Sequence, residues 1–301
     1  EVPVVLEYNC VTFAVMMASP TDLIDFSYGF SLTEGIISTE KDIIYAQIKK
    51  APNGLVAAIE INAQAFHRLE KYNRALSGRT GCGLCGVDKL EQAIKPLEKV
   101  VSTLKVEAAQ IHKSMQNIKS HQHLNEETGA LHAAAFVNET GNIIAVREDV
   151  GRHNALDKLI GHLMREKINP AMGYALITSR CSFEMVQKCA IAGIPIVAAV
   201  SATTGLAIDL AEQAGISVIA FARKGGMNIC LIQILGCIYI KKRIPFIGPV
   251  DLNWPIFLDQ AQHFSLAIFK CHFNIIKKFS IPKGQYRMDL PIRFCHDNWV
   301  L

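Results

Sequence analysis

Short apolar blocks separated by polar residues mark the first hundred positions of the chain. Residues 2–6 and 11–16 have the length and β-branched content of short strands, and residues 55–61 predict a third strand. Thr21-Asp22 provides a cap for a helix that follows directly. Strands and a helix in this order predict a small mixed unit.

From residue 105 the pattern changes to a regular alternation of amphipathic and continuously apolar segments. A helix near 106–119 precedes two apolar runs, 131–137 and 143–148, which are joined by the turn-forming residues 139–142. Helices are then expected at 152–166, 182–192 and 206–214, with strands at 174–178, 195–200 and 217–221. One hairpin followed by β–α alternation predicts a mixed sheet covered by helices.

The predicted fold class is therefore α/β (α+β), and 301 residues suit roughly two domains. We expect a small N-terminal α+β domain at 1–104, with a mobile glycine-rich loop at 77–86, and a mixed-sheet domain at 105–229. Residues 230–301 contain no Glu, both Trp and seven of the 14 Phe. They form an atypical C-terminal extension of unknown role, which is either an appended module or a poorly ordered or non-native segment.

The net charge of +4 comes from this extension. It holds nine of the 31 basic residues and four of the 27 acidic ones, which leaves 22 basic and 23 acidic residues in the rest of the chain. A general nucleic-acid-binding surface needs a basic face. We therefore predict no nucleic-acid partner.

The longest uncharged run, residues 190–208, approaches the length of a membrane span. It contains Gly193, Pro195 and Gly205, so we interpret it as a buried strand between two helices. The chain shows no secretory leader, and its nine cysteines lack framework spacing. These features predict a cytoplasmic protein without a membrane partner.

The loop Arg79-Thr80-Gly81-Cys82-Gly83-Leu84-Cys85-Gly86 carries the most reactive chemistry. Glycines around Cys82 and Cys85 free the backbone and leave both sulfurs little cover. The nearby Arg79 favours a thiolate. Such a pair points to redox chemistry, metal ligation or sulfur handling. A closed zinc site needs four ligands, and the other cysteines form no second C-x-x-C. We predict no metal site, although a structural disulfide and half of a metal site stay open as alternatives.

Three predicted strand-to-helix junctions carry polar side chains. Arg152 and His153 open one helix, Ser179 precedes the next, and Ser201 precedes the third. Helix N-termini attract anions, and ligands favour the carboxyl ends of strands in open sheets. We expect a ligand pocket there, with Asp149 either capping the first helix or pairing with Arg152. The alternatives are a structural role for His153 and helix capping by Ser182.

A fourth group follows the last predicted strand. Gly225 and Gly226 can bring backbone N–H groups close to a ligand, and Arg223 and Lys224 add cationic donors. An ordinary strand-end turn is the alternative interpretation of this run.

Four runs taken together resemble the FdhD/NarQ family of formate dehydrogenase accessory sulfurtransferases, from about residue 1 to residue 228. They are residues 26–37 (FSYGFSLTEGII), residues 81–86 (GCGLCG), residues 147–158 (REDVGRHNALDK), and residues 178–184 (TSRCSFE) with 198–202 (AAVSA).

The resemblance implies a second domain with a cytidine-deaminase-like fold and a cytoplasmic homodimer. The protein would take persulfide sulfur from a cysteine desulfurase. It would pass that sulfur to the molybdenum or tungsten bis(molybdopterin guanine dinucleotide) cofactor of formate dehydrogenase, of which GDP is a partial mimic. The family's persulfide cysteine falls on Cys82 and its second loop cysteine on Cys85. Its cofactor-binding run falls on Phe221-Ala222-Arg223-Lys224-Gly225-Gly226.

Two rival functions remain. The protein could be a non-catalytic chaperone of the cofactor whose cysteines act as a redox latch. The implied fold also suggests a zinc deaminase, which uses H-x-E at one helix start and P-C-x-x-C at the next. Here Ala155 replaces the catalytic Glu, and Glu184 replaces the second cysteine after Cys181. Deamination is therefore not expected.

Overall fold

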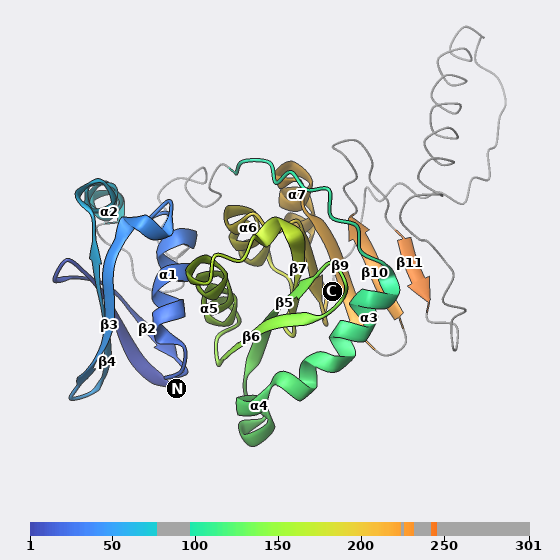
Figure 1. Ribbon diagram of the computed structural model, residues 1–301, viewed down its shortest axis with the longest axis horizontal. Helices are drawn as coiled ribbons and strands as arrows, with labels where there is room; N and C mark the ends of the chain where they lie inside the picture. Colours follow the sequence, from blue (N-terminus) through green and yellow to red (C-terminus); the bar gives the residue numbers. More distant parts are fainter. Residues whose placement is uncertain (77–96, 224–225, 232–241, 246–301) are drawn as a thin grey trace, which may run out of the picture. The chain divides into compact units, whose positions relative to one another are not determined.

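The computed structural model describes residues 1–76, 97–223, 226–231 and 242–245 (Figure 1). The chain divides into two compact units, Glu1–Val250 and Asp251–Leu301, and all described residues belong to the first. The loop expected at 77–86 lies outside the described residues.

The N-terminal part is a four-stranded mixed sheet in the order β2-β1-β4-β3. The β1 strand is parallel to β4, and the other neighbours are antiparallel. The elements are β1 (Val2–Tyr8), β2 (Val11–Ala18), α1 (Leu23–Thr33), β3 (Ile43–Ala51), β4 (Gly54–Ile61) and α2 (Ala63–Leu76), with a 3₁₀ turn at Glu40–Asp42.

One face of this sheet is buried. Val4, Leu6 and Tyr8 alternate along β1 and pack with Phe26 and Phe30 of α1. The three predicted strands and the helix start are confirmed, whereas β3 and α2 were not predicted. Thr21-Asp22 does not cap α1 by a side-chain bond, although Asp22 occupies the N-cap position.

The second sheet has seven strands in the order β11-β10-β9-β8-β7-β5-β6, so the predicted mixed sheet is confirmed. The β7, β8 and β9 strands are mutually parallel, and the other neighbours are antiparallel. The strands are β5 (His132–Asn138), β6 (Ile143–Asp149), β7 (Gly173–Ile177), β8 (Ile196–Ala199), β9 (Ser217–Arg223), β10 (Gly226–Leu231) and β11 (Lys242–Pro245). The helices are α3 (Ala108–Asn117), α4 (His123–Thr128), α5 (Arg152–Arg165), α6 (Phe183–Ala192) and α7 (Gly205–Ala214), with 3₁₀ turns at Ile118–His121 and Pro170–Met172.

Both faces of this sheet are covered, which explains its continuously apolar strands. Ala134 and Phe136 of β5 point into the core formed with α5, α6 and α7. On the opposite face, Tyr174 of β7 and Ser114 of α3 join their hydroxyls at 3.0 Å. The uncharged run 190–208 contains β8 between α6 and α7, as predicted. Among the described helices, none has both the length and the apolar content that crossing a bilayer requires.

The β10 strand runs across the predicted limit at 229, and β11 pairs with it antiparallel. The sheet therefore has two strands beyond the last one that the sequence predicted. The domain limits at 104 and 230 stay predictions.

Helix α1 of the first sheet packs closely on α5 of the second (Figure 1). A side-chain carbon at Gly29 would overlap the Asp157 carbonyl, and one at Gly161 would overlap the Asp25 carbonyl. The two helices approach to backbone contact because each lacks a Cβ where they cross.

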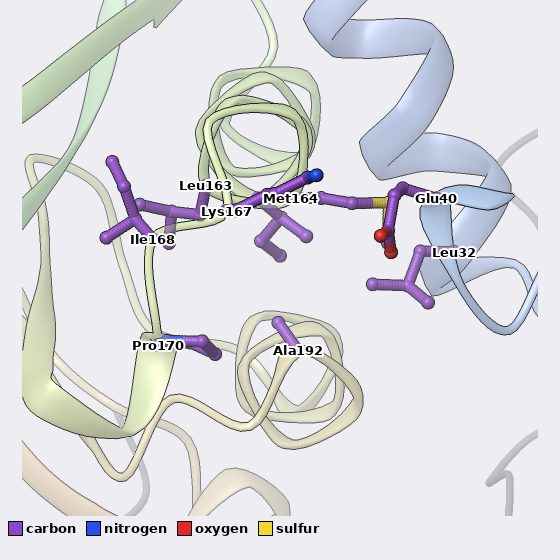
Figure 2. A pocket seen from close by; sticks show the side chains of 9 residues that line it. Leu32, Glu40, Leu163, Met164, Lys167, Ile168, Pro170 and Ala192 are labelled. Atoms are coloured by element: carbon purple, nitrogen blue, oxygen red, sulfur yellow. The ribbon is translucent and has the colours of Figure 1, made fainter.

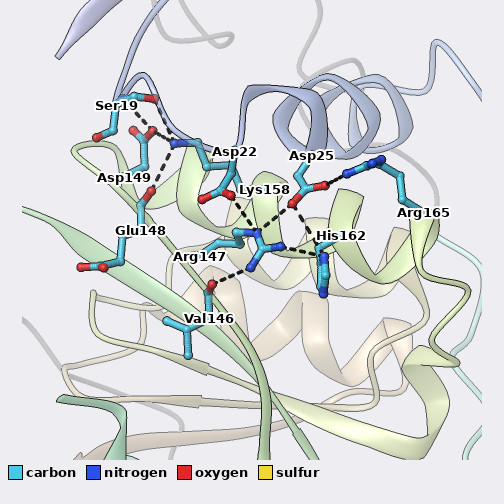
Figure 3. Close-up of polar contacts among 10 residues, drawn as sticks. All are labelled: Ser19, Asp22, Asp25, Val146, Arg147, Glu148, Asp149, Lys158, His162 and Arg165. Carbon is cyan, nitrogen blue, oxygen red and sulfur yellow. Dashed lines mark hydrogen bonds and ion pairs between the residues drawn. The ribbon is translucent and has the colours of Figure 1, made fainter. Parts of the chain in front are cut away.

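Charged side chains flank this crossing (Figure 3). Asp25 is 3% exposed and accepts a hydrogen bond from Arg147 Nε at 2.8 Å and another from Arg165. Arg147 also donates to His162 Nδ1 at 2.7 Å. Burial, and then the charge of Arg147, lowers the pKa of His162, so the neutral ring can accept this bond.

Asp149 belongs to a second buried pair. Its carboxylate lies 2.6 Å from Lys158 Nζ, and neither side chain is exposed (Figure 3). It also accepts hydrogen bonds from the backbone N–H groups of Ser19 and Gly151. Of the two alternatives expected for Asp149, pairing with Arg152 is therefore wrong. Asp149 fixes the entry to α5 instead.

Candidate functional site

The carboxyl ends of four strands meet at one edge of the seven-stranded sheet. The β7, β8 and β9 strands are parallel, and β6 runs in the same direction because β5 is antiparallel to both β6 and β7. Helices α5, α6 and α7 begin where β6, β7 and β8 end. The three predicted junctions therefore converge.

Backbone hydrogen bonds join the loops at this edge. Cys181 N–H donates to the Ala202 carbonyl at 3.0 Å, and Thr204 N–H donates to the Cys181 carbonyl at 3.1 Å. Phe221 N–H donates to the Ser201 carbonyl at 3.1 Å. These bonds hold three successive strand ends in a fixed arrangement.

The first junction gathers cationic groups. Arg152 Nε and His153 Nε2 are buried and have no hydrogen-bond partner among the described residues. His153 Nε2 nevertheless lies 3.1 Å from Glu184 Oε2 of α6, which is an ion-pair distance without hydrogen-bond alignment. At the start of β5, burial and then the charges of Arg152 and His153 lower the pKa of His132. This corner is suited to bind an anion.

Serines occupy the second and third junctions. Ser179 is 4% exposed, and its hydroxyl donates to the Arg180 carbonyl at 3.0 Å. Ser182 occupies the N-cap position of α6, as one alternative expected, but its hydroxyl donates to Glu184 Oε2 at 3.1 Å and makes no side-chain capping bond. Ser201 is partly exposed, and Thr204 caps α7.

The fourth group lies at the end of β9. Phe221 has a φ of 53°, a left-handed conformation that is strained for a bulky residue. Ala222 is buried, and the exposed Arg223 places its guanidinium carbon 5.4 Å from the Phe221 ring centroid. Lys224 and Gly225 lie outside the described residues, and Gly226 begins β10.

Below the junctions a buried ion pair joins α5 to α6. Lys188 Nζ lies 2.8 Å from Asp157 Oδ2 and donates to Thr33 Oγ1 of α1 at 2.9 Å. Burial opposes the charge of Lys188, but the Asp157 and Glu34 carboxylates outweigh it and raise the pKa of Lys188. The pair ties three helices together.

The cysteine at the second junction, Cys181, is unsuited to nucleophilic chemistry. Cys181 is fully buried, and burial raises the pKa of its thiol to about 12. Ala155, which stands where a deaminase has its Glu, lies in the core. In the described ranges no three His, Cys, Asp or Glu side chains are grouped to hold a metal ion. Cys82 and Cys85 lie outside those ranges.

A separate cavity of about 400 Å³ lies at the other ends of α5 and α6 (Figure 2). Leu32, Leu163 and Ala192 give it an apolar lining, and Lys167 and Glu40 add charged groups. Of the sequence-predicted site residues that the structure describes, none lines it.

The sequence profile of the FdhD/NarQ family matches residues 1–231. This chain belongs to the FdhD/NarQ family. The resemblance inferred from the four sequence runs is thereby confirmed.

Relatives within the family carry the name sulfur carrier protein FdhD. The protein from Bordetella petrii is 48% identical over 229 residues, which cover 76% of this chain and 82% of the relative. Those from Bordetella bronchiseptica and Variovorax paradoxus are 46% and 44% identical, and the matches cover 76% and 74% of this chain and 83% and 80% of the relatives. A crystal structure from Desulfotalea psychrophila, assigned as a formate dehydrogenase accessory protein, matches with a TM-score of 0.57. It is 24% identical, the match covers 75% of this chain and 85% of that one, and it supports the fold.

Two side chains of this FdhD/NarQ chain were missed as site residues. The sequence analysis named Glu184 only as a residue that departs from the deaminase pattern, and it did not name His132. The order of the strands in the sheet brings both side chains close to Arg152 and His153. That order cannot be predicted from the local sequence. The position of Glu184 in the first helical turn after Ser182 was the sequence feature that could have indicated a role at this junction.

Proposed function

We propose that this chain is a sulfur carrier that accepts persulfide sulfur on Cys82 from a cysteine desulfurase. It passes the sulfur to the molybdenum or tungsten bis(molybdopterin guanine dinucleotide) cofactor required by formate dehydrogenase. The relatives named sulfur carrier protein FdhD and the C-x-x-C pair support this role. The structural observation that carries it is the convergence of four strand ends on one cation-rich edge.

Sulfur loading is a thiol exchange. The Cys82 thiolate attacks the outer sulfur of the donor persulfide, and the donor's S–S bond breaks. The donor cysteine leaves as a thiolate, and Cys82 carries the new S–S bond. Oxidation states are conserved, so loading needs no external oxidant or reductant.

Release requires two electrons because the carried sulfur must leave as sulfide. The Cys85 thiolate can supply them by attacking the inner sulfur of the Cys82 persulfide. A Cys82–Cys85 disulfide then forms, and hydrosulfide departs towards the acceptor. A cellular thiol reductant resets the pair, which suits the cytoplasm.

The acceptor is a substrate whose guanosine diphosphate arms are anionic. Arg152, His153 and Arg223 supply cations for them, and the N-termini of α5, α6 and α7 supply partial positive charge. Ser179 and Ser201 lie at the neighbouring junctions. The run Phe221-Ala222-Arg223-Lys224-Gly225-Gly226 completes the proposed cofactor site, and GDP is its partial mimic.

The proposed partners are the desulfurase, formate dehydrogenase and a second copy of this chain. The edge strand β2 supports the homodimer, because its sequence, VTFAVMMA, has no charged residue or proline to prevent pairing with another strand.

The decisive experiment measures sulfur on the purified full chain after incubation with a cysteine desulfurase and cysteine. Mass spectrometry should find one added sulfur atom on the peptide containing Cys82, and cyanide should remove it. Cys82→Ala should abolish the label, whereas Cys10→Ala, at an exposed cysteine in the first hairpin, should retain it.

An unlabelled wild-type chain, or a label that survives in Cys82→Ala, would contradict the carrier role. If such an unlabelled chain still bound GDP, the cofactor-chaperone function would be favoured instead.

A further inference from the structure

One carboxylate oxygen joins the first turns of two helices at the candidate site. Glu184 Oε2, on α6, lies 3.1 Å from His153 Nε2 of α5 and accepts a hydrogen bond from Ser182 at the same distance. The His153 and Glu184 side chains are 34% and 25% exposed. They lie at the sheet edge where the anionic substrate is proposed to bind.

An acidic residue in the first turn of a helix commonly stabilises that helix alone. Glu184 does more, because its carboxylate contacts the neighbouring helix. The pKa of Glu184 is lowered, chiefly by the contact with His153. Burial acts in the opposite direction but is outweighed. Glu184 is therefore ionised at neutral pH.

Three titratable or charged groups of the described residues face His153. Arg152 precedes it on α5, His132 lies on β5, and Glu184 lies on α6. Arg152 is a permanent cation, which opposes a second positive charge beside it. Glu184 is the anion among the three, so it offsets that repulsion.

The contact engages Nε2, one of the two ring nitrogens of His153. A carboxylate beside Nε2 leaves Nδ1 for a second partner. In the described residues, no hydrogen bond involves His153 Nδ1. When the ring is protonated, Nδ1–H is a donor for an anionic oxygen.

We propose that Glu184 is a positioning residue that holds His153 through Nε2, so that Nδ1–H donates to a phosphate oxygen of a guanosine-diphosphate-type ligand. This inference rests on the proposed function, because it deepens the nucleotide-binding half of it. Glu184 acts only through His153 and makes no contact with the ligand.

The test measures GDP binding to the full chain by calorimetry between about pH 5.5 and 8.5, around the ordinary titration range of histidine. For the wild type, affinity should fall as the pH rises, because only a protonated imidazole can donate from Nδ1 while Nε2 faces a carboxylate. Glu184→Gln should weaken binding roughly tenfold at neutral pH, the scale of one charge-assisted hydrogen bond.

Two further variants separate positioning from general damage. Glu212→Gln, at an exposed site on α7, is the matched control and should bind like the wild type. In a His153→Ala background, Glu184→Gln should cause no additional loss. Thermal melting of each variant checks that it is folded.

Equal binding by wild type and Glu184→Gln across the pH range would overturn this inference and leave the proposed function intact. An equal, pH-independent loss in both His153 backgrounds would overturn it too, because Glu184 would then act without His153. Absence of GDP binding by the wild type would overturn it together with the nucleotide-binding half of the proposed function, while sulfur loading of Cys82 is tested separately.

Discussion

At the scale of single residues, the most sensitive contact is the buried pair of Lys188 and Asp157. Lys188→Met should lower the free energy of unfolding by about 3–5 kcal/mol, because Asp157 would keep a buried charge without its partner. Urea unfolding of the full chain measures this loss.

The double variant Lys188→Met/Asp157→Leu should recover a large part of the lost stability, because both charges are then gone. A single variant within about 1 kcal/mol of the wild type would show that the pair contributes no more than an exposed ion pair.

Residue types were easier to predict than their partners. The sequence placed Arg152, His153, Ser179 and Ser201 at strand-to-helix junctions because local apolar patterning locates strand ends. The alternative that paired Asp149 with Arg152 was wrong, because the partner of Asp149 is Lys158, one of several polar residues of α5 that the sequence does not single out.

At the scale of elements, the crossing of α1 and α5 depends on glycine. Gly161→Ala should destabilise the chain by roughly 1–3 kcal/mol, because the new methyl group would overlap the Asp25 carbonyl. Intrinsic helix preference alone predicts a gain in stability for this substitution, since alanine is favoured over glycine in a helix by about 1 kcal/mol. Thermal unfolding of the two proteins decides between these effects.

Gly205→Ala is the matched control for that substitution. It lies at the start of α7, where a Cβ would meet no atom within 4 Å, so it should be neutral or slightly stabilising. If Gly161→Ala behaved in the same way, the helices would not be in backbone contact.

Elements with strong periodicity or continuous apolar character were predicted to within a few residues. The three helices α5, α6 and α7 and the strands between them belong to this class. The β3 strand was missed because it is an edge strand with few buried positions, so its residues do not alternate cleanly. The β10 strand was missed, although it directly follows its partner β9, because its composition merges with the C-terminal extension.

At the scale of the whole molecule, β2 is the exposed edge of the first sheet. Among the described residues only β1 pairs with it, and Val15 and Met17 are 59% and 47% exposed. An uncharged strand can pair antiparallel with its own copy about a twofold axis without like-charge repulsion. The proposed homodimer would then continue the four-stranded sheet across both chains.

Val15→Lys should convert such a dimer to a monomer, because a charge would stand beside its symmetry mate. Light scattering of the purified chain measures the mass directly. Ile144→Lys, on the exposed edge of the other sheet, is the control and should remain dimeric. A dimer that survives Val15→Lys and dissociates with Ile144→Lys would move the interface to β6.

The glycine-mediated crossing of α1 and α5 has a practical consequence for cloning. A truncated gene product that stops ahead of the second sheet would leave Asp25 without Arg147 and Arg165 and would uncover the helix face around Gly29. Chimaeras between relatives should therefore exchange α1 and α5 together. Exchanging one helix alone would pair two helices whose backbones are not matched at the crossing.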